Sequence, residues 1–131
     1  MINGGILLTG GSGHRMRGQV GDKILLSLHG KPIFQYSFEV FCESGLFNEL
    51  VIVHRDKSQQ KALETVASKA NLSDIPKVTW VTGGNERMDS VQNGLQAFQD
   101  PPELVFIHDC ARPAISRGLL NELAFAASKH G

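Results

Sequence analysis

The stretch LLTGGSGHRM, residues 7–16, is the part of this sequence that decides the fold. An aliphatic run there ends in three glycines within four positions, and basic residues follow. A short apolar run without polar interruption is typical of a parallel strand buried on both faces, and in open parallel sheets the ligand crevice lies beyond the carboxyl ends of the strands. The stretch therefore predicts a buried strand that ends at a ligand-binding edge.

Other segments of the chain repeat this pattern and alternate with helical ones. Short apolar runs rich in β-branched residues predict strands at residues 6–9, 50–53, 78–81 and 104–107. Apolar side chains recur at helical spacing in three stripes, namely Phe34, Phe38 and Phe41; Met88, Val91, Leu95 and Phe98; and Leu120, Leu123, Ala124 and Ala127. Residues 57–70 are polar, with good helix formers and no Gly or Pro, which predicts a solvent-facing helix. The alternation predicts an α/β fold with a mostly parallel sheet between helices.

Composition limits the size of the fold and the class of partner. With 131 residues, of which 41% are hydrophobic and 20% charged, the chain can bury one core, and we expect a single domain over residues 1–131. Thirteen Lys and Arg residues balance thirteen Asp and Glu residues. No overall field then attracts nucleic acid or an acidic membrane, so we expect neither as a partner, and any anion site is local.

Cysteine usage and hydropathy indicate the compartment. Cys42 and Cys110 lie far apart and form no metal-ligand pattern, so we expect two free thiols in a reducing environment. No apolar run reaches the length of about 18 residues that suggests a membrane span, and no basic segment leads into a signal-type apolar one. The sequence therefore predicts a cytoplasmic protein.

Residues 10–23 combine a glycine turn with positive charge. Gly10, Gly11 and Gly13 permit positive φ and close approach of backbone N–H groups to an anion. The basic side chains that accompany them are His14, Arg15, Arg17 and Lys23. A triphosphate needs such a group, because backbone dipoles and cations together must offset its charge. The alternative is a solvated connector, and the spacing matches neither Walker A nor the full G-x-G-x-x-G pattern.

Two other polar segments follow predicted strands. In TGGNERMDSVQNGL, residues 82–95, Gly83 and Gly84 would let a flat ligand approach, and Asn85 occupies the expected N-cap position. Ser90 could hydrogen-bond a base edge there. The alternative is a capped helix with ordinary surface charges, which is the better interpretation for Arg87 or Asp89 taken singly.

The last segment, HDCARP, covers residues 108–113. Asp109 at a strand end is suited to hold a divalent metal that bridges phosphates, although a helix N-cap is the alternative. Arg112, fixed by Pro113, could hold a second anionic substrate. For His108 the simpler interpretation is a side chain that satisfies hydrogen bonds in the core.

Four segments together resemble one family, namely LLTGGSGHRM, DKILLSLHGKPI, GGNERMDSVQNGL and HDCARP. In this order they resemble 2-C-methyl-D-erythritol 4-phosphate cytidylyltransferases of the non-mevalonate isoprenoid pathway, over nearly the whole chain. The first two are shared with sugar-phosphate nucleotidyltransferases and with molybdenum cofactor guanylyl- and cytidylyltransferases, whereas the later pair is far more specific. The resemblance implies a Rossmann-like three-layer sandwich of the nucleotide-diphospho-sugar transferase type.

The resemblance also implies a reaction and a set of site residues. The 4-phosphate of methylerythritol phosphate would attack the α-phosphorus of CTP and release pyrophosphate, with Mg²⁺ as the cation. Arg15 and Lys23 would be the catalytic cations, Asp109 would contact the acceptor and the metal, and Arg112 would lie towards the acceptor. The nucleotide would contact Thr9, Gly10, Gly11, Ser12, Gly13, Gly84, Asn85, Ser90, Asp109 and Cys110.

The chain departs from the family pattern in several places. Thr9 and Gly10 stand where two alanines are usual, GDK replaces the commoner PKQ before Ile24, Asn85 replaces a frequent acidic residue, and Cys110 replaces an alanine. Family members also continue beyond the position of Gly131, with more sheet, further cationic residues and an arm that pairs two subunits. We therefore expect the C-terminal part of the fold to be lacking, and a homodimer would need other contacts.

Three functions fit these observations. The first is an active cytidylyltransferase with CTP and a sugar-alcohol phosphate as small-molecule substrates. The second is a nucleotide-binding chain that does not catalyse. The third is a related nucleotidyltransferase that acts on ribitol 5-phosphate or on a molybdopterin-type acceptor.

Overall fold

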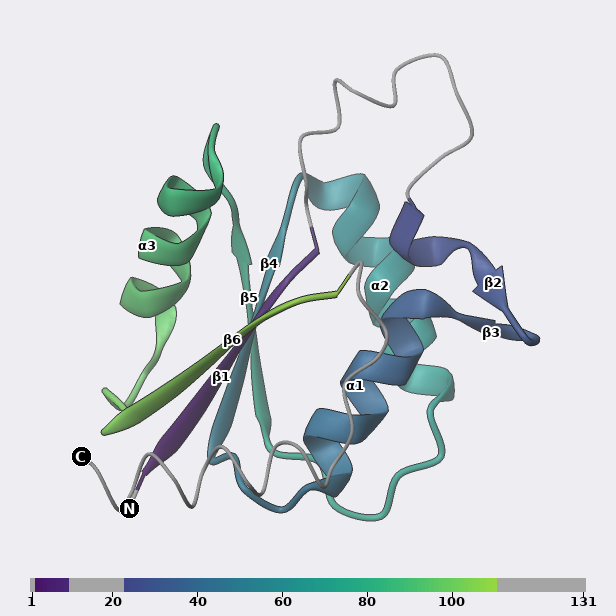
Figure 1. Ribbon diagram of the computed structural model, residues 1–131, viewed down its shortest axis with the longest axis horizontal. Helices are drawn as coiled ribbons and strands as arrows, with labels where there is room; N and C mark the ends of the chain where they lie inside the picture. The colour runs from purple at the N-terminus through teal and green to yellow at the C-terminus, as the bar shows by residue number, and fades with distance from the viewer. Residues whose placement is uncertain (1, 10–22, 111–131) are drawn as a thin grey trace.

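A computed structural model describes residues 2–9 and 23–110 of the chain, and its centre is a four-stranded parallel sheet (Figure 1). The strands are β1 (Asn3–Leu8), β4 (Glu49–His54), β5 (Lys77–Thr82) and β6 (Leu104–Asp109). They lie in the order β5-β4-β1-β6, and every pairing is parallel. All four predicted strands are therefore confirmed, with β1 beginning three residues earlier than residue 6 because Asn3, Gly4 and Gly5 also pair with β6.

Helices cover both faces of this sheet. α1 (Ile33–Glu43) and α2 (Lys57–Lys69) lie on one face, and α3 (Arg87–Ala97) lies on the other (Figure 1). The predicted three-layer α/β arrangement is thus confirmed, while the expected helix with the Leu120 stripe falls outside the described residues. Within residues 2–9 and 23–110, no helix is both long enough and apolar enough to cross a membrane.

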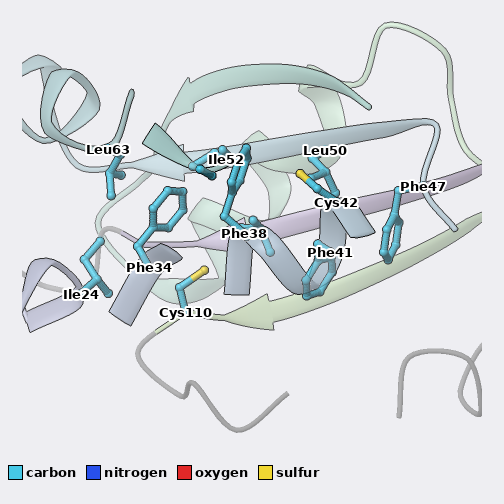
Figure 2. Close-up of a cluster of buried hydrophobic side chains, with 12 residues drawn as sticks. Ile24, Phe34, Phe38, Phe41, Cys42, Phe47, Leu50, Ile52, Leu63 and Cys110 are labelled. Atoms are coloured by element: carbon cyan, nitrogen blue, oxygen red, sulfur yellow. The ribbon is translucent and has the colours of Figure 1, made fainter. Parts of the chain in front are cut away.

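The larger core lies between the sheet and α1 and α2 (Figure 2). Phe34, Phe38 and Phe41 of α1 are each at most 2% exposed, as their helical spacing predicts. They pack on alternate residues of the central strands, including Leu7 and Leu50. α2 has a polar outer surface, as predicted, but its Leu63 is fully buried in this core.

The second core lies under α3, and it corrects one prediction. Alternate residues of β1 and β4 face Val91 and Phe98, so the two middle strands are buried on both faces. Met88, expected in the same buried stripe, is 69% exposed, and Leu95 is 42% exposed. The reason is that residues 84–89 form an exposed run, so that the first turn of α3 has no sheet beneath it, and Val91 is the first apolar residue of the helix to reach the sheet.

The edge strands are less buried than predicted. β5 and β6 are mostly half-buried, and Ile107 of β6 is 43% exposed. Both strands lie at an edge of the four-stranded sheet, where one neighbour is missing within the described residues. Burial on both faces therefore holds for β1 and β4 and is wrong for β5 and β6.

A short 3₁₀ helix and a hairpin, neither of them predicted, connect residue 23 to α1. η2 (Lys23–Leu25) precedes β2 (Ser27–Leu28) and β3 (Lys31–Pro32), which pair antiparallel. The two loop residues, His29 and Gly30, have φ angles of 55° and 81°, the pattern of a type I′ turn. Strands of two residues carry too little periodicity to be recognised from sequence.

The strand order creates a switch in the direction of the chain. From β1 the chain moves outward through β4 to β5, and then it crosses back to place β6 on the opposite side of β1. In open α/β sheets the ligand crevice lies at the carboxyl ends of the strands where such a reversal occurs. The point between the ends of β1 and β6 is therefore the expected centre of a ligand site.

The burial of Leu63 leads to a test of the core. Leu63→Ala should lower the free energy of unfolding by about 2–5 kcal/mol, because a buried leucine leaves a cavity when it is truncated. The matched substitution Leu95→Ala, at a half-exposed position, should cost about 1 kcal/mol or less. Urea unfolding of both variants measures the difference, and equal losses would contradict this assignment of the core.

Candidate functional site

The three predicted ligand-binding segments begin at the same edge of the sheet. Each continues the hydrogen bonding of its strand by one backbone bond: Thr9 N–H to the Val53 carbonyl at 3.1 Å, Gly83 N–H to His54 at 2.7 Å, and Cys110 N–H to Leu8 at 3.0 Å. The first residues beyond β1 and β6 are therefore held on neighbouring strands, and the first residue beyond β5 lies at the same carboxyl end of the sheet, with β4 between it and β1. The starting points of the three segments therefore lie at the carboxyl ends of the parallel strands, where a ligand crevice is expected.

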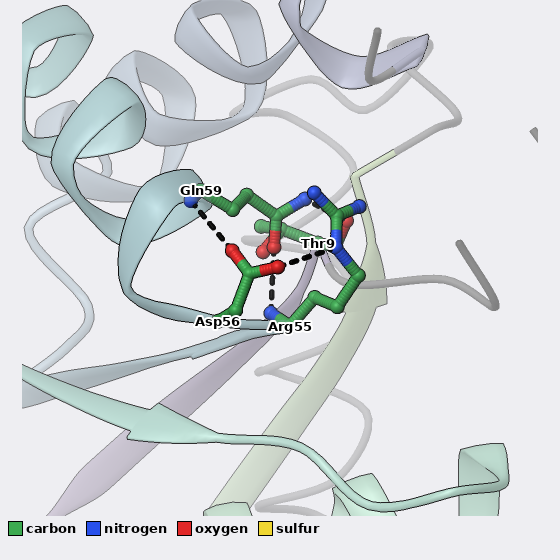
Figure 3. A network of polar contacts seen from close by, with 4 residues as sticks. All are labelled: Thr9, Arg55, Asp56 and Gln59. Carbon is green, nitrogen blue, oxygen red and sulfur yellow. Dashed lines mark hydrogen bonds and ion pairs between the residues drawn. The ribbon is translucent and has the colours of Figure 1, made fainter. Parts of the chain in front are cut away.

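Thr9, at the exit from β1, is held by a side chain of α2 (Figure 3). The Gln59 amide Nε2 donates to the Thr9 carbonyl at 3.2 Å, and its Oε1 accepts from the Arg55 backbone N–H at 2.6 Å. The Thr9 hydroxyl donates to the Val53 carbonyl at 2.6 Å. Because Gln59 is only 2% exposed, these bonds fix the main chain where it leaves the sheet.

The start of α2 fixes Gln59 in turn. Asp56 is the N-cap of α2, and its Oδ1 accepts from the Gln59 backbone N–H at 2.8 Å. This bond, together with one from the Arg55 side chain, holds the pKa of the Asp56 carboxyl below its usual value. Gln59 was not among the predicted site residues, although an N-cap residue followed three positions later by Gln is a known start signal of helices.

The turn after β5 is packed against the first turns of α3. The Gly84 N–H donates to the Ser90 hydroxyl at 3.1 Å, and the Asn93 amide Nδ2 donates to the Thr82 carbonyl at 3.0 Å. A Cβ atom at Gly83 would lie 2.6 Å from Ser90 Oγ, and one at Gly84 would lie 2.3 Å from Asp89 Cβ. A side chain at Gly84 would therefore clash with α3, and one at Gly83 would displace the Ser90 hydroxyl. Asn93 was not among the predicted site residues.

The predicted N-cap of α3 was wrong. Glu86, not Asn85, is the cap: its side chain accepts from the backbone of Asp89, and the Asp89 carboxylate accepts from the Glu86 N–H at 3.2 Å. The helix begins one residue later than expected because this reciprocal capping box satisfies two N–H groups, whereas a single Asn cap satisfies one. Asn85 is left exposed next to the turn, and Asp89 serves the cap.

The last residue of β6 and the residue that follows it differ in burial. Asp109 is the last residue of β6, half-buried and paired in register with Leu8. Cys110 is fully buried beside the larger core (Figure 2), and burial raises the pKa of its thiol far above the usual value. A ligand at this edge would therefore meet the main chain of Cys110 and not its sulfur.

The remaining thiol and the histidine of this strand are structural. His108 Nε2 lies 3.0 Å from the Ser37 hydroxyl of α1, which supports its predicted role in the core. Cys42 is also buried and free, and burial raises the pKa of its thiol to about 12. The expectation of two free thiols is confirmed, and neither is ionised near neutral pH.

Several predicted site residues lie outside the described part of the chain. These are Gly10, Gly11, Ser12, Gly13, Arg15 and Arg112. Lys23 begins η2, at the start of the second described range. No group of three or more His, Cys, Asp or Glu side chains among residues 2–9 and 23–110 could hold a metal ion.

Comparisons with known proteins agree on one family. The sequence model of the family described as 2-C-methyl-D-erythritol 4-phosphate cytidylyltransferase (IspD) matches residues 5–131. A protein of this name from Lachnospira eligens is 37% identical over 121 residues, which cover 92% of this chain and 51% of the relative. Another, from Clostridium botulinum, is 32% identical over 129 residues, or 98% of this chain and 55% of the relative. The chain thus spans about half the length of the curated relatives it matches.

Solved structures share the fold. A 4-diphosphocytidyl-2C-methyl-D-erythritol synthase from Anaerococcus prevotii superposes with a TM-score of 0.79 at 22% identity, covering 98% of this chain and 52% of its own. A CMP:2-keto-3-deoxy-manno-octonic acid synthetase, solved in complex with CTP, gives a TM-score of 0.71 at 14% identity and covers 98% of this chain and 48% of its own. At these identities the likeness concerns the arrangement of strands and helices.

Loss of the Gln59 amide should destabilise the sheet edge. Gln59→Leu should lower the free energy of unfolding by about 1–3 kcal/mol, because the Thr9 carbonyl and the Arg55 N–H lose a buried partner. Gln60→Leu, at the neighbouring half-buried position whose amide donates only to the exposed Glu64 side chain among the described contacts, is the control and should change stability by about 0.5 kcal/mol or less. Chemical unfolding measures both, and equal effects would argue against a role for the buried amide.

The burial of His54 predicts a pH dependence of stability. His54 is 3% exposed, and burial lowers the pKa of its imidazole. Below the pKa of about 6.5 that a histidine has in the unfolded chain, His54 binds a proton more readily in the unfolded state than in the folded state. The free energy of unfolding should therefore be highest above that pH and should decrease as the pH falls. Between about pH 5 and 8, the free energy of unfolding should decrease less with falling pH in His54→Gln than in the unsubstituted chain. An unchanged slope would contradict the assignment.

Proposed function

The chain belongs to the 2-C-methyl-D-erythritol 4-phosphate cytidylyltransferase family, and from this premise we propose that it binds CTP and transfers CMP to methylerythritol phosphate. The observation that supports the proposal most is the convergence of three polar segments on the carboxyl ends of β1, β5 and β6. In this proposal the nucleotide lies across these strand ends, at the reversal of strand order between β1 and β6.

The turn after β5 is the proposed site for the base. Gly83 and Gly84 pack closely against α3. Because they have no side chains, a flat ring can approach their main chain closely. The Ser90 hydroxyl accepts from Gly84 and still has its own O–H to donate to a base edge. Asn85 is exposed beside them. As the resemblance to the family implies, Gly84, Asn85 and Ser90 would recognise cytosine and help to exclude larger purines.

The segment after β1 is the proposed site for the triphosphate. In the proposal the main chain from Thr9 through Gly10, Gly11, Ser12 and Gly13 wraps the phosphates, as glycine-rich turns do for anions. Arg15 and Lys23 would stabilise the charge that develops on the triphosphate. The chain has a formal net charge of +0, so these local cations carry the attraction.

Asp109 is the proposed ligand for Mg²⁺. Its single carboxylate at the end of β6 suits a magnesium ion, which is commonly held by one or two carboxylates together with substrate phosphates. When bound, the ion would neutralise phosphate charge during the transfer. Arg112 would bind the phosphate of the acceptor, and the Cys110 main chain would border the nucleotide.

The proposed reaction needs no covalent enzyme intermediate. An oxygen of the acceptor 4-phosphate forms a bond to the α-phosphorus of CTP, and the bond from that phosphorus to the oxygen bridging the β-phosphate breaks. Pyrophosphate leaves with the electron pair. The residues of the chain then act by positioning the two substrates and by stabilising charge, which is where most of the rate enhancement of phosphoryl-type transfer comes from.

The second candidate function is CTP binding without catalysis. The chain spans 51% of the Lachnospira eligens relative and 55% of the Clostridium botulinum one. Ribitol 5-phosphate and molybdopterin-type acceptors are the alternative substrates within the same enzyme class. We also propose a cytoplasmic location and a homodimer.

A turnover assay separates these functions. With CTP, Mg²⁺ and methylerythritol phosphate, the purified chain should release pyrophosphate, and Arg15→Ala should reduce the rate about 100-fold because a charge-stabilising donor is lost. Calorimetric binding of CTP without any turnover above that variant would favour the binding-only function. The absence of CTP binding would contradict both, and turnover with another acceptor alone would reassign the substrate.

A further inference from the structure

Two consecutive peptide units of the turn after β5 are hydrogen-bonded, the first at both of its ends and the second through its N–H. In the unit between Thr82 and Gly83, the carbonyl accepts from Asn93 Nδ2 at 3.0 Å and the N–H donates to His54 at 2.7 Å. In the next unit, the Gly84 N–H donates to Ser90 Oγ at 3.1 Å. A peptide unit is planar, so bonds at both of its ends fix its orientation. The sheet fixes one end of the first unit, and α3 fixes the other.

The position of α3 makes these bonds geometrically accessible. Gly94, adjacent to Asn93, is buried against the sheet, and a Cβ atom there would lie 3.1 Å from Ile6 Cγ2 and 3.2 Å from Val53 Cγ2. The helix therefore approaches the strands more closely than an ordinary side chain would allow. This close approach brings the short amide of Asn93 within reach of the last residue of β5.

We propose that Asn93 is a positioning residue for nucleotide specificity, because its amide sets the orientation of the main-chain turn that reads the base. The inference rests on the proposed function, since it takes that turn as the cytosine site. Cytosine carries an amino group where uracil carries a carbonyl oxygen, so main-chain donors and acceptors distinguish them only when their directions are fixed. A misoriented turn would lose this discrimination while the phosphates still bind.

The hydrogen bond between Asn93 and Thr82 should contribute little to the stability of the fold, which separates the proposed role from a merely structural one. Thr82 is exposed and Asn93 is half-buried, so water can replace the bond between them when the amide is removed. The loss should therefore have little effect on unfolding. Its effect should fall on the preference for CTP over UTP, which depends on the direction of the peptide groups.

The test compares two variants of Asn93 with a neighbouring control. Asn93→Asp keeps the shape but cannot donate to the Thr82 carbonyl, Asn93→Ala removes the group, and Gln92→Ala changes an exposed residue on the same helix. Calorimetry with CTP and with UTP, each with excess Mg²⁺, measures the dissociation constant of UTP divided by that of CTP. Both Asn93 variants should reduce this ratio about fivefold, the equivalent of one neutral hydrogen bond. Gln92→Ala should leave it unchanged, and the melting temperatures should stay within about 5 °C of each other.

Other outcomes would overturn the inference. Equal weakening of CTP and UTP binding, or no change in either, would mean that Asn93 does not orient the base-reading turn. A wild-type chain that binds CTP without preferring it to UTP would instead contradict the proposed cytosine site, and the inference would fall with it. The two failures are distinguished by the wild-type ratio, which is measured first.

Discussion

Parallel pairing of β1 with β4 on one side and with β6 on the other is the constraint on which the rest of the structure depends. Leu8 pairs in register with Val53 of β4 and with Asp109 of β6, so the carboxyl ends of these strands coincide. Because β1 and β4 are buried on both faces, a shift of register by one residue would exchange their two apolar faces. The same burial that stabilises the fold therefore aligns the candidate site.

Short polar side chains of the helices then fix the main chain at this edge. Gln59 of α2 holds the Thr9 carbonyl, while Ser90 and Asn93 of α3 hold the turn after β5. On the same face as α2, Ser37 of α1 contacts His108 of β6. Helices on both sides of the sheet thus carry donors to the strand ends, and a site built from preoriented main-chain groups needs little reorganisation when a ligand binds.

The strands and the apolar face of α1 could be predicted from sequence because burial leaves a direct pattern of apolar residues. Features governed by single polar contacts could not. Gln59 looked like one polar residue of a solvent-facing helix, and its near-complete burial depends on a carbonyl fifty residues away. The cap of α3 is Glu86 and not Asn85, because a second residue, Asp89, completes the reciprocal pair of hydrogen bonds. Met88 fits the helical period, but the sheet does not extend beneath it.

Amide chemical-shift mapping by NMR during a titration with CTP and Mg²⁺ tests the central claim most directly, and a chain of 14.3 kDa suits this method. The account predicts that shifts concentrate at the carboxyl edge, at Thr9, Gly84 and Asp109. Asn3 and Glu49, at the amino ends of the same strands, should not respond. Shifts centred on the amino edge, or none at saturating CTP, would contradict a nucleotide site at the carboxyl ends of β1, β5 and β6.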